Sequence, residues 1–110
     1  MLCCDYSQGH HEINKNPYGI LAGIKENEIF KQETWGAEIC DVMKPAAGDI
    51  VASGKRGLCG FASTNLDFIL RQNDCKNLVL AGFLTNCCVE STMRSGYELG
   101  YRGKFICVYY

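Results

Sequence analysis

Several features that mark common classes of protein are missing from this chain of 110 residues. Its formal net charge is only −1 and its lysines and arginines form no cluster, which argues against nucleic acid or an anionic membrane as an obligate partner. No apolar run approaches the length of a transmembrane helix. The N-terminus has neither the basic region nor the apolar segment of a secretory signal, so we expect a cytoplasmic protein.

The sequence also lacks any Cys-x-x-Cys pair, the usual start of a small zinc site. A metal could draw on one cluster near the N-terminus, formed by Cys3, Cys4, His10 and His11. This cluster fits no common zinc-finger spacing, so we expect no bound metal, no cofactor and solvent-exposed histidines. Internal repeats and low-complexity segments are absent as well, and the length suits a single domain.

Cysteine itself is abundant, at 8 residues, and would indicate a disulfide framework in a secreted protein. Reduced thiols are the better interpretation here. Cys3-Cys4 and Cys87-Cys88 are adjacent pairs that cannot bridge internally without strain, and Cys107 lies in an apolar run. The remaining pattern can form a core without covalent links, and a cytosolic compartment keeps thiols reduced.

Regular secondary structure is expected mainly after residue 45. Residues 1–33 are polar and turn-rich, which indicates a long surface loop with one short helix around residues 20–30. A short helix or turn is expected over residues 37–43. Beyond it, the pattern predicts strands over 49–52, 77–82 and 104–110 and helices over 65–72 and 88–99.

The order of these elements predicts the fold class. Their β-α-β-α-β alternation is typical of an α/β fold with a parallel sheet covered by helices. The run 77–82 is apolar throughout, as in a strand buried on both faces. Ser63 or Thr64 is the expected N-cap of the 65–72 helix, and Asp67 could complete a capping box.

The segment 78–100 has an arrangement that can activate a cysteine. An apolar strand runs into a polar turn that places Cys87 and Cys88 at the start of a helix, which Gly100 ends. Unpaired backbone N–H groups and the positive end of the helix dipole stabilise a thiolate there, the form that attacks a carbonyl carbon. The alternative is that both cysteines are small core residues, since free cysteine is among the most buried residue types.

Lys55 is the second candidate for chemistry. It follows the 49–52 strand, and the carboxyl ends of adjacent parallel strands lie at the same edge of a sheet, so we expect it near Cys88. A lysine ammonium in that place would stabilise developing negative charge. Taken alone, Lys55 is more commonly a solvated loop residue.

Separate sequence blocks follow one another in a specific order through residues 34–110. They are Trp35-Gly-Ala-Glu-Ile, Pro45-x-x-Gly-Asp-Ile-Val, Lys55-Arg, Phe61, Thr64-Asn-Leu-Asp, Leu78-Val-Leu-Ala-Gly, Thr85-Asn-x-Cys-Val-Glu-Ser-Thr-x-Arg and Gly100-Tyr. Their order and spacing resemble those of the isochorismatase-like cysteine hydrolases. The resemblance implies a three-layer αβα, Rossmann-like parallel sheet and an Asp-Lys-Cys catalytic triad.

The same resemblance assigns roles to residues of this chain. Cys88, directly before Val89, takes the position of the nucleophile, and Lys55 takes that of the lysine. A non-proline cis peptide is implied at Phe83-Leu84, with the backbone N–H groups of Leu84 and Cys88 forming an oxyanion hole. The candidates for the substrate pocket are Trp35, Phe61 and Asn86, and for the two aromatic residues plain core packing is the alternative.

The triad aspartate of the family has no counterpart in this sequence. In the family it ends a central first strand, and no matching apolar run is present here. Asp5 resembles a later loop segment, Asp49 begins its strand at the wrong edge, and Asp67 looks like a helix cap. We therefore expect residues 1–110 to form a partial domain whose exposed strand edges favour homo-oligomers.

The resulting prediction is a hydrolase that cleaves amide or ureido C–N bonds of a small molecule through Cys88. The Thr64–Asp67 and Thr85–Thr92 blocks are similar to those of ureidoacrylate amidohydrolases and isochorismatase-like amidases. Nicotinamidases are less similar, because their metal-binding Asp and His cluster is not evident. One alternative is an inactive family member that at most binds partners. A weaker one is a redox or metal module that uses the thiols.

Overall fold

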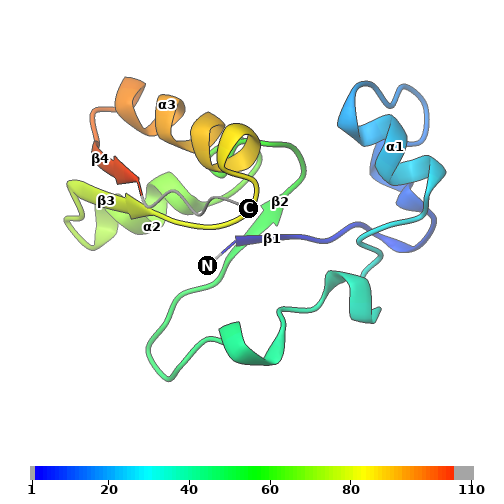
Figure 1. The fold of residues 1–110 in the computed structure, drawn as a ribbon, viewed down its shortest axis with the longest axis horizontal. Coiled ribbons are helices and arrows are strands. Elements are labelled where there is room, and N and C mark those ends of the chain that lie inside the picture. The colour runs from blue at the N-terminus through cyan, green and yellow to red at the C-terminus, as the bar shows by residue number, and fades with distance from the viewer. Residues whose placement is uncertain (1, 106–110) are drawn as a thin grey trace. The chain divides into compact units, whose positions relative to one another are not determined.

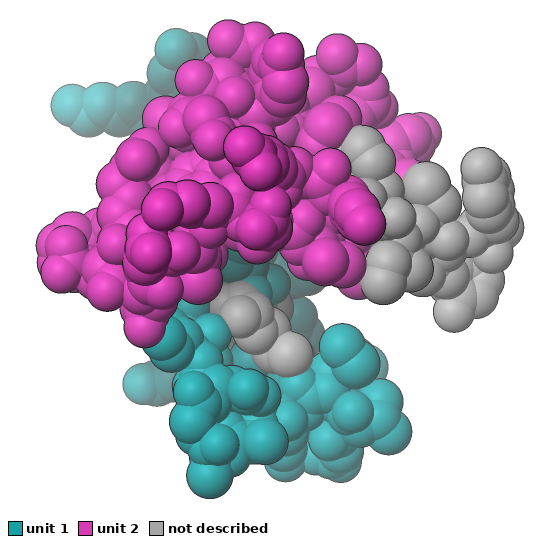
Figure 2. All heavy atoms as spheres, turned by 90° about the vertical axis from the view of Figure 1, so that its left-hand side faces the viewer, with its two compact units in different colours: residues 1–56 teal, residues 57–110 magenta. Residues whose placement is uncertain are grey.

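The structure, a computed structural model, describes residues 2–105 (Figure 1). The chain divides into two compact units, residues 1–56 and 57–110, which are coloured separately in Figure 2. Each unit holds one parallel sheet of two strands. The predicted α/β combination of helices and parallel strands is confirmed, and the described strands pair two by two. Among the described residues, no helix is both long enough and apolar enough to cross a membrane.

The first sheet joins β1 (Leu2–Cys4) to β2 (Ala52–Lys55), with Cys4 opposite Lys55. The sequence did not predict β1, because three residues are too short for a periodic signal. The strand expected over 49–52 begins only at Ala52, since Asp49 closes a turn instead. Its carboxylate accepts the backbone N–H of Ala46 at 2.9 Å, and its own N–H donates to the Ala46 carbonyl at 3.0 Å. Lys55 is therefore the last residue of a strand.

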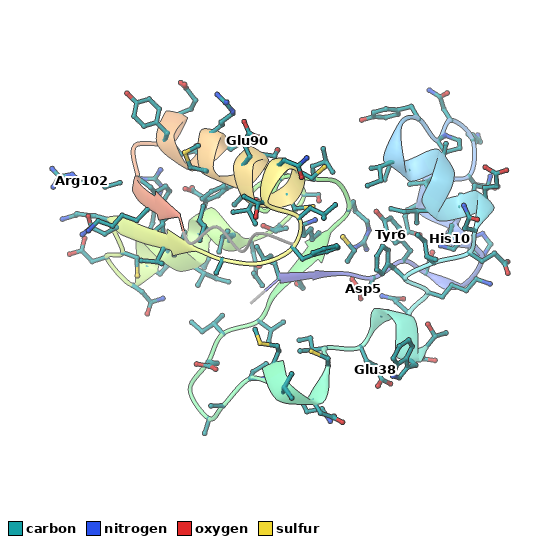
Figure 3. All side chains as sticks on the ribbon, in the orientation of Figure 1. Asp5, Tyr6, His10, Glu38, Glu90 and Arg102 are labelled. Atoms are coloured by element: carbon teal, nitrogen blue, oxygen red, sulfur yellow. The ribbon has the colours of Figure 1, made fainter. Side chains whose placement is uncertain are left out.

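The loop expected over the N-terminal residues is instead a folded segment. It contains a 3-10 helix, Gln8–Ile13, and α1 (Ile20–Glu26), which confirms the short helix expected around 20–30. Tyr6 is fully buried and His10 is 2% exposed, so the expectation of an exposed His10 is wrong, whereas His11 is exposed. Figure 3 shows Tyr6 and His10 side by side, with ring centroids 5.6 Å apart. Together they form the centre of this unit's core.

Two short 3-10 helices, Trp35–Ala37 and Asp41–Met43, occupy the stretch where a short helix or turn was expected. The Trp35 side chain is 89% exposed, so core packing is the wrong interpretation for it. Lys44 closes the second of these helices through an ion pair with Asp41 at 2.5 Å.

The second sheet joins β3 (Asn77–Leu80) to β4 (Arg102–Phe105) in parallel, with Asn77 opposite Arg102. The two helices of this unit are α2 (Leu66–Gln72) and α3 (Glu90–Glu98). Gly100, with φ of +91°, follows α3 as predicted, because glycine tolerates this left-handed conformation. The strand expected over 104–110 begins earlier, at Arg102, and residues 106–110 lie outside the described part of the chain.

The core of the second unit forms where α3 packs against β3. Gly96 allows this approach, because a Cβ there would lie 3.1 Å from the Phe61 ring and 3.5 Å from Leu78. Phe61 stacks on Tyr101 with ring centroids 5.7 Å apart. Leu78 is buried, but its neighbour Val79 is 65% exposed, so the expected burial of both strand faces is wrong.

The start of α2 differs from the predicted capping box. The Thr64 hydroxyl oxygen accepts the Leu66 N–H at 3.1 Å, whereas Asp67 turns away from the helix end. Asp67 accepts hydrogen bonds from Arg71 Nε at 3.0 Å and from the Tyr101 hydroxyl at 2.8 Å. These two donors, Arg71 first, hold the pKa of Asp67 below its usual value. Asp67 therefore links α2 to the residue that precedes β4.

Candidate active site

Cys87 and Cys88 lie in a π-helical turn, Thr85–Val89, that leads directly into α3 (Figure 1). The carbonyl of Leu84 accepts the N–H groups of both Cys87 and Val89, each at 3.2 Å. The sequence predicted a regular α-helix from residue 88, but the α-helix begins only at Glu90. Single π turns of this kind are rare and occur often at functional sites.

The residues before this turn carry a second unusual backbone feature. The peptide bond between Phe83 and Leu84 is cis, at the position that the resemblance implies. Gly82, just before it, has a φ of +140°, which is accessible to glycine and costly for other residues. The backbone N–H of Leu84, one of the two predicted oxyanion donors, belongs to this cis peptide and directly precedes the π turn.

Thr92 fixes the backbone at Cys88, a role that the sequence analysis missed. Its buried hydroxyl donates to the Cys88 carbonyl at 2.6 Å and accepts the N–H of Gly60 at 2.8 Å. Threonine commonly bonds the carbonyl four residues earlier in a helix, and that spacing was visible in the sequence. Thr92 therefore connects the cysteine turn to the loop that precedes α2.

Cys59 lies in the same loop and provides a further attachment to α3. Its thiol lies 3.2 Å from the Ser95 hydroxyl, and its sulfur accepts the Phe61 N–H at 3.3 Å. Together with the Thr92 contact, these bonds attach the loop to α3 at successive turns of the helix.

Lys55, the second predicted site residue, belongs to the first unit. It is only 7% exposed, so the interpretation as a solvated loop lysine is wrong. Its Nζ donates a hydrogen bond to Cys4 Sγ at 3.3 Å. The expected proximity of Lys55 to Cys88 assumed that their strands are neighbours in one sheet, whereas β2 and β3 belong to different sheets. That proximity stays a prediction.

The carboxylates of the first unit gather around Arg56. Arg56 pairs with Asp5 at 3.4 Å and with Glu12 at 3.2 Å, and its guanidinium lies 5.4 Å from the centroid of the Tyr6 ring. The second oxygen of Asp5 accepts a hydrogen bond from Gln32 at 3.1 Å. Asp5, directly after β1, is the acid at the carboxyl end of the strand beside Lys55, but its contacts connect it to Arg56 and Gln32.

Burial and hydrogen bonds set the protonation of this cluster. Burial, with a smaller contribution from the neighbouring Cys4, raises the pKa of Tyr6 to about 12. Its protonated hydroxyl donates to the Arg56 carbonyl. Burial opposes ionisation of Glu12, but hydrogen bonds from Ser7 and the charge of Arg56 outweigh it and lower the pKa of Glu12. The cluster is therefore arranged for a neutral phenol and a charged carboxylate.

An open hollow of about 310 Å³ lies on the first unit. Its lining residues are Asp5, Gln32, Glu33, Thr34, Ala37 and Glu38. Asp5 and Glu38 are labelled in Figure 3. The predicted pocket residues Trp35, Phe61 and Asn86 do not line this hollow. Within residues 2–105, no group of three or more His, Cys, Asp or Glu side chains could hold a metal ion.

Comparison with known sequences extends the resemblance noted above. Residues 5–105 match the sequence model of the isochorismatase domain. The chain is 40% identical over 78 residues to the ureidoacrylate amidohydrolase RutB of Pseudomonas savastanoi, over 71% of this chain and 31% of that protein. It is 38% identical over 81 residues to RutB of Agrobacterium fabrum, over 74% of this chain and 35% of that protein. The chain thus spans about a third of the length of these curated relatives.

Solved structures give the same result for the fold. N-carbamoylsarcosine amidase from Thermoplasma acidophilum superposes with a TM-score of 0.74 and 28% identity, over 96% of this chain and 54% of that one. A cysteine hydrolase from Pseudomonas syringae pv. phaseolicola superposes with a TM-score of 0.78 and 24% identity, over 96% of this chain and 47% of that one. Because the domain match extends over nearly all described residues and these folds agree, the chain belongs to the isochorismatase family and shares its α/β fold.

Proposed function

We propose that this chain carries the nucleophile of an amidohydrolase that cleaves the C–N bond of a small ureido or carbamoyl compound. The backbone at Cys88 carries the proposal, because the residue lies in a π turn and its carbonyl accepts the Thr92 hydroxyl. The relatives named ureidoacrylate amidohydrolase and N-carbamoylsarcosine amidase both take their names from compounds of this class. Family membership alone would leave the reaction open.

In the proposed reaction, Cys88 Sγ attacks the carbonyl carbon of the substrate. The C–N bond then breaks, the amine leaves with a proton, and water hydrolyses the thioester. The backbone N–H groups of Leu84 and Cys88 stabilise the negative oxygen of the tetrahedral intermediate, and the Lys55 ammonium adds positive charge. Asp5 is bound by Arg56 and Gln32, and we do not assign it the role of proton acceptor.

Backbone contacts and the family block support the choice of Cys88 over its neighbour Cys87. Thr92 donates its hydroxyl proton to the carbonyl of Cys88, whereas the N–H of Cys87 is used within the π turn by Leu84. Cys88 is also the residue that directly precedes Val89 in the family block. Asn86, exposed in the same turn, offers an amide donor and acceptor to a substrate.

Ammonia release from a panel of ureido and carbamoyl compounds tests this proposal. Cys88→Ala should abolish turnover, and Cys87→Ala should retain most of it, which makes the adjacent cysteine a matched control. Activity that survived in Cys88→Ala would sink the assignment of the nucleophile. Circular dichroism of both variants would verify that they remain folded.

A catalytically inactive family member is the second candidate, and the contacts of Asp5 favour it. The acid beside the lysine strand is paired with Arg56 and accepts a hydrogen bond from Gln32. Such a protein would bind a ureido compound without releasing ammonia. Calorimetric binding by both wild type and Cys88→Ala, with no turnover in either, would select this alternative.

A further inference from the structure

A cysteine and a lysine of the first unit, Cys4 and Lys55, lie in direct contact. Parallel pairing of β1 and β2 places the two residues opposite each other. Lys55 Nζ lies 3.3 Å from Cys4 Sγ and donates a hydrogen bond to it. Lys55 is 7% exposed, whereas Cys4 is half-buried.

This placement is unusual for a lysine. Lysine is almost never buried without a partner, and here the strand register delivers its amine to a sulfur atom. Two other cysteines face different chemistry: Cys59 contacts the Ser95 hydroxyl, and Cys75 contacts the Asn73 carbonyl. Neither of those groups is a nucleophile comparable to an amine.

We propose that Cys4 and Lys55 form a covalent modification site, in which a peroxide joins the two side chains through a reversible sulfur–nitrogen bond. Oxidation of a cysteine to its sulfenic acid makes the sulfur electrophilic, and a nitrogen nearby can then condense with it. The observed distance between the two atoms is what such a condensation requires, since no strand has to move apart or slide.

The chemistry balances in two steps. First, the Cys4 sulfur attacks one oxygen of hydrogen peroxide, the O–O bond breaks, and water leaves, so that sulfur is oxidised by two electrons and peroxide is reduced. Second, the unprotonated Lys55 amine attacks the sulfur, the S–O bond breaks, and the hydroxide leaves with an amine proton as a second water. The net product is Cys-S-NH-Lys, two hydrogen atoms lighter than the starting pair. A thiol reductant breaks the sulfur–nitrogen bond and returns the Cys4 thiol and the Lys55 amine.

The predicted effect of this bond on activity rests on the proposed function, whereas the prediction that the sulfur–nitrogen bond forms does not. A sulfur-bound Lys55 nitrogen no longer carries the ammonium charge that the proposed reaction uses. Peroxide should therefore lower amidohydrolase turnover, and a thiol reductant should restore it. The test below measures the bond by mass, so that a failure of the proposed function leaves its outcome intact.

The experiment maps peptides of the full chain after treatment with hydrogen peroxide, alkylation of free thiols and digestion without reductant. The expected result is a linked peptide pair joining residues 4 and 55, lighter by two hydrogen atoms and separated by dithiothreitol. Oxidised Cys4 recovered as sulfinic acid, as a disulfide or as a dimedone adduct, without the linked pair, would overturn the proposal. So would a Cys4 that peroxide leaves reduced.

The peptide map of the wild-type protein is sufficient to test the proposal, and three variants serve as controls. Lys55→Arg keeps a donor near the sulfur but removes the amine, so Cys4 should be captured by dimedone instead of by residue 55. Cys4→Ser should give no linked pair. Cys40→Ser, which removes an exposed cysteine of the same unit, should leave the linked pair at its wild-type level.

Discussion

The two units of this protein each hold a two-stranded parallel sheet, but they are stabilised by different interactions. In the first unit, Arg56 joins two carboxylates and a buried tyrosine, and a buried lysine contacts a thiol. In the second, Leu78, Gly96 and Phe61 form an apolar contact under α3. The unit with the proposed nucleophile thus depends on packing, and the unit with the lysine depends on charge and protonation.

Substitution of a glycine inside a helix should give the largest difference in unfolding free energy between the two units. Gly96→Leu inserts a side chain where a Cβ alone would lie 3.1 Å from Phe61, and overpacking of this kind should cost about 3 kcal/mol of unfolding free energy. Gly23→Leu in α1 is the matched control, because no atom lies within 4 Å of its Cβ position. It should stabilise the protein by about 0.5–1 kcal/mol through helix propensity. Urea unfolding of both variants measures this contrast, and equal effects would contradict it.

Removal of Arg56 should produce the next largest effect. Arg56→Met leaves Asp5 and Glu12 without their shared partner, and we expect a loss of about 2 kcal/mol, reduced by the partial exposure of all three side chains. Arg71→Met in the second unit is the control. Its pair with Asp67 is exposed on the surface and should contribute far less to the unfolding free energy. A similar loss in both variants would show that the first unit does not depend specially on charge.

Thr92→Val should have a smaller effect on stability and a separate effect on turnover. The variant keeps the shape of the side chain but leaves the Gly60 N–H without its acceptor, at a cost of about 1 kcal/mol. Loss of the bond to the Cys88 carbonyl should also lower kcat more than it changes KM, whereas Thr92→Ser should restore both. A variant with wild-type kcat would show that Thr92 only supports the fold.

Tyr6→Phe should have the smallest effect on stability at neutral pH and a clear effect at alkaline pH. The pKa of Tyr6 is raised from 10.0 to about 12, so its contribution to stability is complete below pH 10.0 and is lost as the pH rises toward 12. Tyr6→Phe should weaken this alkaline loss, measured as the urea midpoint against pH. Tyr97→Phe, at a side chain that is 73% exposed, should leave the profile unchanged. An unaltered profile in Tyr6→Phe would contradict the assignment.

At acidic pH, Glu12 should contribute to the pH dependence of stability with the opposite sign to that of Tyr6. Because the folded pKa of Glu12 lies below the ordinary value of 4.5, its contribution is present above that value and disappears as the pH falls through the folded pKa. Glu12→Gln should therefore lose less stability on acidification than the wild type. The acid and alkaline parts of the stability–pH profile together indicate how far the first unit depends on protonation.

The sequence predicted the second unit better than the first, for a physical reason. Residues 77–80, 90–98 and Gly100 carry strong local signals: an apolar run, a helical period and a helix-ending glycine. The elements of the first unit depend on contacts between distant residues. β1 becomes a strand only by pairing with β2 some fifty residues later, and the burial of His10 depends on the Ile29 carbonyl, 2.9 Å from its Nε2.

The same distinction applies to the candidate site. The cis peptide at Phe83-Leu84 was implied by the family resemblance of one contiguous block of sequence and is confirmed, whereas the role of Cys88 stays a prediction. The contact of Lys55 with Cys4 could not be inferred in this way, because it depends on the register of two strands that are distant in the chain. The π turn was also missed, since its sequence does not differ visibly from the start of an ordinary helix.

Trapping the covalent intermediate tests the central claim most directly. The protein would be mixed with a ureido or carbamoyl substrate, quenched in acid and digested, and the acyl group located by mass spectrometry. We predict a substrate-derived adduct on Cys88 that is absent in Cys88→Ala and present in Cys87→Ala. Turnover accompanied by an adduct on Cys87, or turnover that persists in Cys88→Ala, would contradict the account.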